Sequence, residues 1–157
     1  DRDGVINHDY GYVHSKKKFV LRKNVLKGLK YLNKLDYYIF IVTNQSGIAR
    51  GYYGEDKFIK FQKEVNESFA IKDLFINDTL YCPHHVDGKL KKYKINCKCR
   101  KPGTLMIKNI INNFDIDLKK SFFIGDAKKD QICAKNANLK FYYSKTDFYK
   151  TLIEIIN

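Results

Sequence analysis

Apolar runs that favour β-strands alternate with helical patterns along the chain, and this alternation is the strongest constraint on its fold. Segment 37–42 is continuously aromatic or β-branched, as a buried strand would be, and segment 121–124 reads as another buried strand. Alternating strands and helices predict an α/β fold, a Rossmann-like, doubly wound parallel sheet with helices on both faces. The strands are expected at 37–42, 79–81, 121–124 and 139–143, and the helices at 24–35, 55–69, 104–114, 128–137 and 146–156.

Length and composition predict one domain. The chain has 157 residues, of which 44% are hydrophobic and 30% charged, so it can form a substantial core and is unlike a disordered segment. No linker or repeat divides it, and we expect a single domain over 1–157 with no large cap domain. A parallel sheet of this kind also predicts a strand directly before Asp1, which we expect in the intact gene product.

The net charge of +13 comes from 30 Lys and Arg against 17 Asp and Glu. A basic surface attracts polyanions or small phosphate esters. The lysines are scattered along the chain, so we expect a small-molecule partner and no nucleic acid. No apolar run reaches the roughly 18 residues that cross a bilayer, so no membrane partner is expected, and we predict a cytoplasmic monomer.

The chain opens with two carboxylates in the pattern Asp1-x-Asp3-Gly4. Alternate side chains of an extended segment share a face, so the two acids would repel unless a cation or a shared proton compensated. Mg²⁺ suits oxygen ligands and phosphate. One carboxylate could attack phosphorus while the other moves a proton, although a surface turn with two solvated acids is the alternative.

Three further polar motifs follow predicted strands or lie in the long loop 82–101, and each alone would also fit an ordinary polar turn. In such a sheet, functional side chains collect at the carboxyl ends of the strands. Hydroxyl, amide and backbone N–H groups can hold a phosphate, Arg and Lys can pair with it, and a strand-end Asp can complete a magnesium site. The motifs are Thr43-Asn44-Gln45-Ser46-Gly47, Cys99-Arg100-Lys101-Pro102 and Gly125-Asp126 with Asp130.

Three of the four cysteines lie in loop 82–101, close to histidines. Cys82 and His84 are followed, after twelve residues, by Cys97 and Cys99. Three thiolates and one imidazole are a tetrahedral Zn²⁺ set, and four protein ligands predict a structural rather than a catalytic ion. The adjacent His85 is the alternative ligand. The zinc would pin the loop and so bring its Arg and Lys to the active site.

The order of these motifs resembles the haloacid dehalogenase-like phosphatases over nearly the whole chain. Within that superfamily, the runs 1–7, 11–14, 43–51 and 81–85 look like the D-glycero-D-manno-heptose 1,7-bisphosphate 7-phosphatase family. The sequence departs from the family pattern at three places. Val5 stands where Thr is also common, Ala127 stands where Lys often follows Gly-Asp, and Leu105-Met106 replaces Gly-Met.

The resemblance implies a Mg²⁺-dependent phosphatase that acts through an aspartyl-phosphate, with a heptose bisphosphate substrate in the synthesis of ADP- or GDP-heptose precursors. Asp1 would be the nucleophile and Asp3 the proton donor and base, with Thr43 and Lys101 stabilising the transferred phosphoryl group. Mg²⁺ would be held by the Asp1 and Asp126 carboxylates and the Asp3 carbonyl. The implied substrate contacts are Asp9, Tyr10, Gly11, Tyr12, Asn44, Gln45, Ser46, Arg50 and Arg100.

The stretch from Asp9 to Tyr12 is expected to act as a specificity loop, with a plain surface hairpin as the alternative. Two other substrates remain open at the sequence level, histidinol phosphate and a polynucleotide 3′-phosphate. A non-catalytic, zinc-stabilised binding module is the alternative from a different class.

Overall fold

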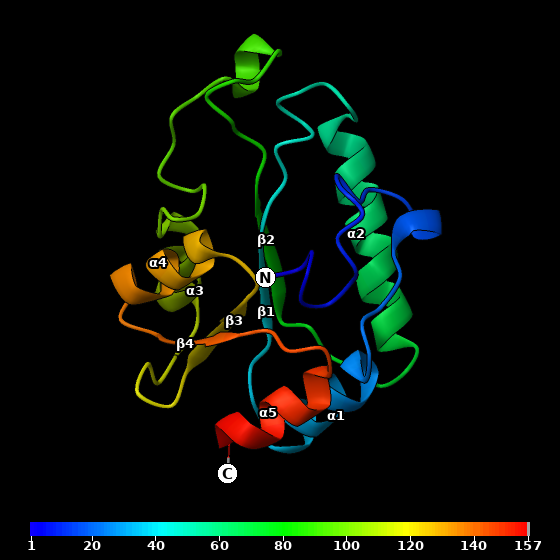
Figure 1. Cartoon of the computed structure of the whole chain (residues 1–157), viewed down its shortest axis with the longest axis vertical. Helices are drawn as coiled ribbons and strands as arrows, with labels where there is room; N and C mark the ends of the chain where they lie inside the picture. The colour runs from blue at the N-terminus through cyan, green and yellow to red at the C-terminus, as the bar shows by residue number, and fades with distance from the viewer. Residues whose placement is uncertain (157) are drawn as a thin grey trace.

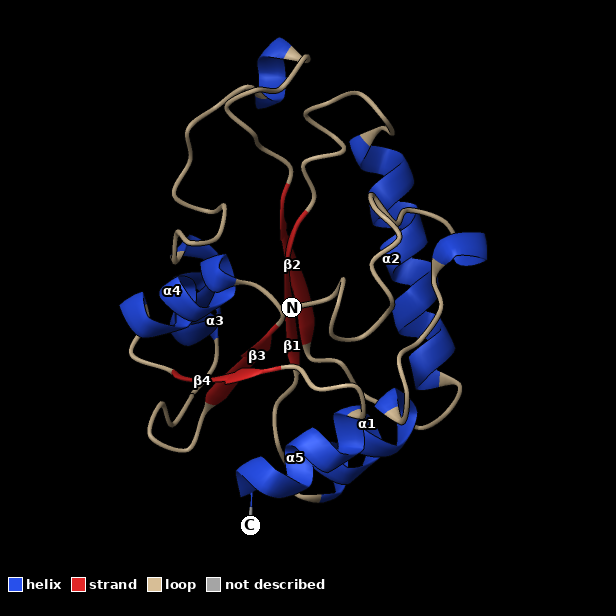
Figure 2. Cartoon of the chain, viewed as in Figure 1, coloured by secondary structure: helices blue, strands red, loops and turns tan. Residues whose placement is uncertain are grey.

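The computed structural model describes residues 1–156 and confirms the α/β arrangement with parallel strands (Figures 1 and 2). The elements in chain order are α1 Val25–Lys34, β1 Phe40–Asn44, α2 Glu55–Ala70, β2 Asp78–Cys82, α3 Leu105–Asn113, β3 Phe122–Gly125, α4 Lys128–Asn136, β4 Lys140–Tyr143 and α5 Phe148–Ile156. Two short 3₁₀ turns add Lys16–Lys18 and Lys91–Tyr93. None of the helices described is both long and apolar enough to cross a membrane.

The strands pair in parallel as two separate ladders. β1 pairs with β2, with Phe40 opposite Asp78 and Asn44 opposite Cys82. β3 pairs with β4, with Phe122 opposite Lys140. Within residues 1–156, no backbone ladder joins β1 to β3, so the expected continuous sheet is interrupted at its centre.

The first strand begins three residues later than predicted and extends two residues further. The segment before it is held by other partners, because the Tyr37 N–H donates to the Leu32 carbonyl at the end of α1 (3.1 Å). The Ile39 N–H donates to the Asn77 side chain (2.7 Å). These bonds terminate α1 and delay the start of β1. Residues 43–44 belong to the end of the strand rather than to a loop after it, because they pair with Tyr81 and Cys82 of β2.

Two apolar clusters cover opposite faces of the strands. One joins residues of α1, α2 and α5 to Ile39 and Ile124. The other joins residues of α3 and α4 to Val42 and Phe123. Figure 1 shows α3 and α4 on one side of the strands and α1, α2 and α5 on the other. The expectation of helices on both faces is therefore confirmed, and within the described residues no separate cap domain is present.

A cavity of about 470 Å³ lies between the two ladders. Its walls are largely apolar and come from both ladders and both helical layers, and they include Leu29, Ile41, Ile107 and Phe123. Asp1 also lines it, and its main-chain nitrogen donates to the Ile124 carbonyl (2.8 Å). The strand predicted ahead of Asp1 would fit between β1 and β3, and it stays a prediction.

A short apolar segment joined to Asp1 tests this. With about five β-branched residues, the length of an ordinary strand, it is expected to pair with β1 and β3 and to raise the melting temperature. Thermal unfolding followed by circular dichroism measures the change. The control carries a Gly/Ser segment of the same length, and equal melting temperatures for both would contradict the prediction.

Candidate active site and metal centres

The Lys101 ammonium lies buried between two carboxylates at the carboxyl ends of β1 and β3. Its Nζ is 2.8 Å from Asp1 Oδ1 and 2.8 Å from Asp130 Oδ1. It also donates to the Val42 carbonyl in β1 (3.1 Å). Removing a charge from water is costly unless it is paired, and here two acids and a carbonyl surround it. The cluster therefore joins the chain start, β1 and α4.

Asp126 adds a third carboxylate to this cluster. One oxygen each from Asp1, Asp126 and Asp130 lies within 4.8 Å of the others. Burial would raise the pKa of Asp130, but the charge and hydrogen bond of Lys101 outweigh it and hold that pKa below its usual value. The pKa of Asp126 is raised by its partial removal from water and by the charge of Asp130.

Three carboxylates facing one ammonium leave an excess of negative charge. Converging carboxylate oxygens are the ligands that hard divalent cations prefer, so the residues fit Mg²⁺. Asp130 also caps the start of α4, since its Oδ2 accepts from the Ala127 N–H (3.1 Å). Its membership of the cluster depends on the packing of α4 against β3 and could not be read from spacing alone.

Gly4 leaves room for the Asp126 carboxylate. Its φ of +80° lies in the region that favours glycine, and a Cβ at this position would lie 2.1 Å from Asp126 Oδ2. The glycine of the Asp-x-Asp-Gly motif therefore does more than turn the chain. It lets a carboxylate from the end of β3 approach the backbone after Asp3.

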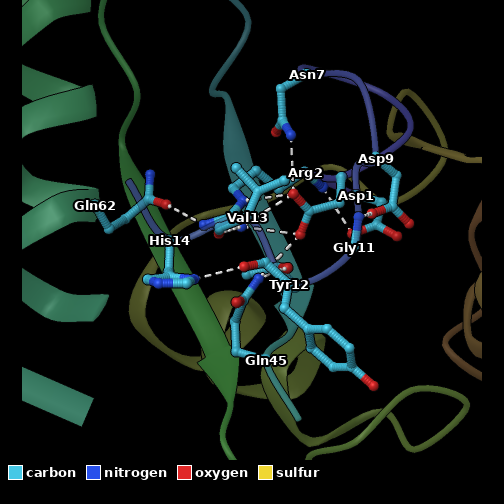
Figure 3. Close-up of polar contacts among 12 residues, drawn as sticks. Asp1, Arg2, Asn7, Asp9, Gly11, Tyr12, Val13, His14, Gln45 and Gln62 are labelled. Carbon is cyan, nitrogen blue, oxygen red and sulfur yellow. Dashed lines mark hydrogen bonds and ion pairs between the residues drawn. The ribbon is translucent and has the colours of Figure 1, made fainter. Parts of the chain in front are cut away.

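Asp3 faces a different set of partners from Asp1 (Figure 3). Its carboxylate accepts from Arg2 Nη2 (2.9 Å), Asn7 Nδ2 (2.9 Å) and Gln45 Nε2 (3.1 Å). Arg2 is itself fully buried and lies over the rings of Phe58 and Phe61. Figure 3 shows Arg2 also reaching Gln62 and the Val13 carbonyl. The sequence does not single out this arginine, because its burial depends on Gln62, Phe58 and Phe61, which lie far along the chain.

The polar side chains at the end of β1 are held by the protein. Gln45 donates to Thr43 Oγ1 (2.9 Å) as well as to Asp3, and it accepts from the Tyr53 hydroxyl (2.7 Å). Asn44 clamps the backbone of Lys101, accepting from its N–H (3.0 Å) and donating to its carbonyl (3.1 Å). Both amides therefore position charged groups of the site.

A polar pocket of about 320 Å³ opens above these groups. It brings together most of the residues singled out from the sequence, namely Asp1, Asp3, Asp9, Gly11, Tyr12, Thr43, Asn44, Gln45, Ser46, Arg100 and Asp126. Tyr53 and Lys129 also line it and were missed, because neither belongs to a motif. Two of the predicted substrate contacts, Tyr10 and Arg50, are not among its lining residues.

Arg50 lies instead beside His85, with Nη2 3.4 Å from the imidazole Nε2. Its Nε is buried without a hydrogen-bond partner among residues 1–156. The pKa of His85 is lowered by burial and by the charges of Arg100 and Arg50. The imidazole therefore lies next to two guanidinium groups, whose charges disfavour its protonated form.

The cysteine cluster predicted from the sequence comes together with His84 as its fourth member. Cys99 Sγ lies 2.9 Å from Cys82 Sγ, 3.1 Å from Cys97 Sγ and 3.3 Å from His84 Nδ1. One donor atom from each of the four lies within 4.8 Å of the others, and all three thiols are free of disulfides. His85 is not in the cluster. The donor set fits Zn²⁺.

The loop that carries this cluster packs on the segment after β1. The N–H groups of Lys89 and Leu90 donate to the Ala49 carbonyl (2.8 and 3.0 Å). The Tyr93 hydroxyl donates to Glu55 at the start of α2 (2.6 Å), and its ring belongs to a third apolar cluster with Ile48. The loop thereby brings Arg100 to the wall of the pocket and Lys101 beneath it.

Comparisons with known proteins agree with this site. A family model described as polynucleotide kinase 3 phosphatase matches residues 3–152. The D-glycero-beta-D-manno-heptose-1,7-bisphosphate 7-phosphatase of Haemophilus influenzae is 41% identical over 140 residues, which cover 89% of this chain and 76% of that protein. The protein of the same name from Pasteurella multocida is 39% identical with the same coverage.

A solved relative matches the fold as well. The D,D-heptose 1,7-bisphosphate phosphatase of B. bronchiseptica, complexed with magnesium and phosphate, superposes with a TM-score of 0.80 at 26% identity. The match covers 99% of this chain and 83% of that one. This relative therefore binds both a cation and an anion. The carboxylate cluster of the present chain would attract such a cation, and the basic side chains of its pocket such an anion.

Replacing Gly4 tests the cation site. Gly4→Ala is expected to weaken Mg²⁺ binding by about tenfold or more, since the new methyl group must displace the Asp126 carboxylate. Isothermal titration measures the affinity. Gly51→Ala is the matched control, because Gly51 has a φ of +73° and a Cβ there would be 3.9 Å from its nearest neighbour, Leu90. Equal affinities in both variants would contradict the assignment.

Proposed function

This chain belongs to the D-glycero-beta-D-manno-heptose-1,7-bisphosphate 7-phosphatase family of haloacid dehalogenase-like phosphatases, and from that premise we propose that it removes the 7-phosphate of the heptose bisphosphate. The single observation that carries the proposal is the Asp1 carboxylate, paired with buried Lys101 at the floor of a polar pocket. The product would feed the synthesis of an activated heptose, such as a lipopolysaccharide precursor.

Asp1 is the proposed nucleophile. Its carboxylate attacks the phosphorus of the 7-phosphate, the bond to the sugar oxygen breaks, and an aspartyl-phosphate forms. Water then attacks that phosphorus and regenerates the carboxylate, so two easier steps replace one slow hydrolysis. Thr43, which lines the pocket, and Lys101, which is buried next to Asp1, stabilise the negative charge on the transferred oxygens.

Asp3 is the proposed proton carrier. It protonates the departing sugar oxygen in the first step and takes a proton from the attacking water in the second. Its contacts with Arg2, Asn7 and Gln45 hold it at the side of the pocket, apart from the Asp1–Lys101 pair. The two carboxylates can therefore do different work although they are two residues apart.

Magnesium fits the negative cluster beside Asp1. The Asp1 and Asp126 carboxylates and the Asp3 carbonyl are the proposed ligands, and Asp130 lies close enough to contribute or to orient Lys101. When bound, Mg²⁺ neutralises the charge of the carboxylates and of the phosphate that approaches them. Gly4 provides the space for Asp126 in this arrangement.

The rest of the substrate would lie along the pocket wall. Arg100, with the Ser46 side chain, is placed to receive the second phosphate, and Asp9 to Tyr12 would contact the sugar. Arg50 does not line the pocket but would contribute positive charge from behind its wall, since its guanidinium lies beside His85 and near Arg100. The proposed substrate is a small phosphosugar, and we propose that the enzyme acts on it as a monomer in the cytoplasm.

Zn²⁺ at Cys82, His84, Cys97 and Cys99 would have a structural role. The loop that contains these residues exposes many lysines and has little apolar core of its own apart from Tyr93 and its neighbours. A closed four-ligand site would fix the loop at the end nearest Arg100. Its ligands offer no open position for substrate, so the zinc would not take part in the reaction.

A polynucleotide 3′-phosphate is the second candidate substrate. The description of the family model and the net charge of +13 favour it. The named relatives favour the sugar bisphosphate. A 3′-phosphorylated oligonucleotide therefore belongs in every substrate comparison, and preferential turnover of that substrate would overturn the heptose proposal.

Phosphate release from heptose bisphosphate tests the proposed reaction. Asp1→Asn is expected to lower kcat by roughly a thousandfold or more, because the amide is a poor nucleophile. Its oxygen can still accept from Lys101, so the melting temperature should change by only a few degrees, as for a loss of about 1 kcal/mol. Near-normal turnover in this variant, or no release by the unmodified enzyme, would reject the proposal.

Removing one cysteine tests the zinc site. Cys97→Ala is expected to purify without stoichiometric zinc and to unfold at a lower temperature, while Cys133→Ala keeps its zinc because Cys133 lies outside the cluster. Elemental analysis and thermal unfolding are the measurements. The assignment fails if the unmodified protein contains no zinc or if the Cys97 variant retains it.

A further inference from the structure

Two aromatic pairs fasten the segment 9–14 to the residues just before α2. Tyr12 and Tyr52 meet edge to face, with ring centroids 4.7 Å apart and planes at 78°. His14 and Tyr53 stack with centroids 4.2 Å apart and planes at 17°. Alternate residues of one segment thus contact consecutive residues of the other, at the pocket described above.

The two pairs differ in burial. Tyr53 is only 6% exposed and donates to Gln45, which in turn holds Asp3. Burial raises the pKa of Tyr53, so its hydroxyl remains a donor. The His14–Tyr53 pair is therefore part of the packed support for the catalytic acid. Tyr52, by contrast, is 53% exposed, and its hydroxyl has no hydrogen-bond partner among the described residues.

Tyr12 needs such support at this position. Its φ of +52° is a conformation that side chains other than glycine rarely adopt. Asp9 Oδ1 accepts from the Gly11 N–H (2.9 Å), and His14 Nδ1 lies 2.6 Å from the Tyr12 carbonyl (Figure 3). These contacts fix the backbone of Tyr12, whereas its ring extends away from them in Figure 3. The ring has its aromatic contact with Tyr52.

We propose that Tyr52 is a positioning residue for substrate selection, which holds the Tyr12 ring at the mouth of the pocket. Tyr12 lines the pocket and Tyr52 does not, so Tyr52 would act through Tyr12. Asp1, Tyr12 and Arg100 line one pocket, so a phosphosugar long enough to reach from Asp1 to Arg100 would meet this ring. A small aryl or alkyl phosphate reaches only the floor of the pocket.

The contact explains why selection and chemistry can be separated. Asp1, Lys101 and Asp3 are held by buried partners that do not include Tyr52. Losing Tyr52 leaves these groups in place and lets only the Tyr12 ring move. Sugar binding then weakens, while the attack on phosphorus is unchanged. This inference rests on the proposed phosphosugar substrate.

Tyr52→Ala tests the proposal through the split between KM and kcat. An edge-to-face pair is typically worth enough to change binding by roughly three- to tenfold, so KM for the heptose bisphosphate should rise by about that factor. The value of kcat, and both constants for p-nitrophenyl phosphate, should stay within about twofold of the unmodified enzyme. Tyr52→Phe keeps the ring and should restore KM.

A double-mutant cycle with Tyr12→Ala checks that the effect passes through Tyr12. The double variant should have a KM no higher than that of Tyr12→Ala alone, because the two changes remove one contact. Tyr38→Ala is the control and should leave KM unchanged. Tyr38 is also more than half exposed, but its ring packs on Phe40, at the start of β1, and on Phe114, after α3.

Several outcomes would overturn the proposal. They are an unchanged KM in Tyr52→Ala, equal losses on p-nitrophenyl phosphate, failure of Tyr52→Phe to restore KM, or additive effects in the cycle. The measurement uses whichever substrate the unmodified enzyme prefers among heptose bisphosphate, fructose 1,6-bisphosphate, histidinol phosphate and a 3′-phosphorylated oligonucleotide. A wrong heptose assignment would appear in the unmodified enzyme, whereas a wrong role for Tyr52 would appear only in the variants.

Discussion

The buried ammonium of Lys101 is the interaction on which the rest of the site depends. It connects Asp1, the end of β1 and Asp130 of α4, three parts of the chain that meet only in the folded protein. A lysine taken from water without partners would lose its charge or unfold its surroundings. The fold must therefore bring both acids to it, and Asn44 fixes its backbone from the neighbouring strand. Asp1, the proposed nucleophile, is therefore held in place by the cluster before substrate arrives.

The same arrangement separates the roles of two acids that are almost adjacent in sequence. Asp1 faces Lys101 and the other carboxylates, where negative charge is in excess and a cation fits. Asp3 faces Arg2 and two amides, where donors are in excess. Alternation along an extended segment would place the two on one face, yet buried Arg2 draws Asp3 to its own side of the pocket. The two carboxylates therefore have different partners, as the separate roles proposed for them require.

Much of this could be predicted from the sequence, because it depends on local pattern. Strand and helix periodicity indicated the α/β layers. The position of the polar motifs after predicted strands indicated that they meet at one edge of the sheet, and the cysteine spacing predicted the metal cluster with His84. What could not be predicted depends on contacts between distant segments. Arg2 is oriented by Gln62, and Asp130 joins the cluster through the packing of α4. The later start of β1 likewise follows from the bond between Ile39 and Asn77, which periodicity cannot reveal.

The segment between β1 and α2 connects these parts of the site. Through Gln45 it holds Asp3, through Ala49 it receives the cysteine-rich loop, and through Tyr52 and Tyr53 it meets the segment that carries Tyr12. The parts of the pocket that would contact the sugar are thus held by the short segment between β1 and α2, which directly follows the end of β1. Asp3, the proposed catalytic acid, is anchored to that stretch through a buried amide, whereas the Tyr12 ring is held by an exposed aromatic contact. Under the proposed roles, exchange of the exposed contact would alter substrate choice without disturbing the acid. The residues proposed for chemistry and for selection would therefore have separate supports within ten residues of one another.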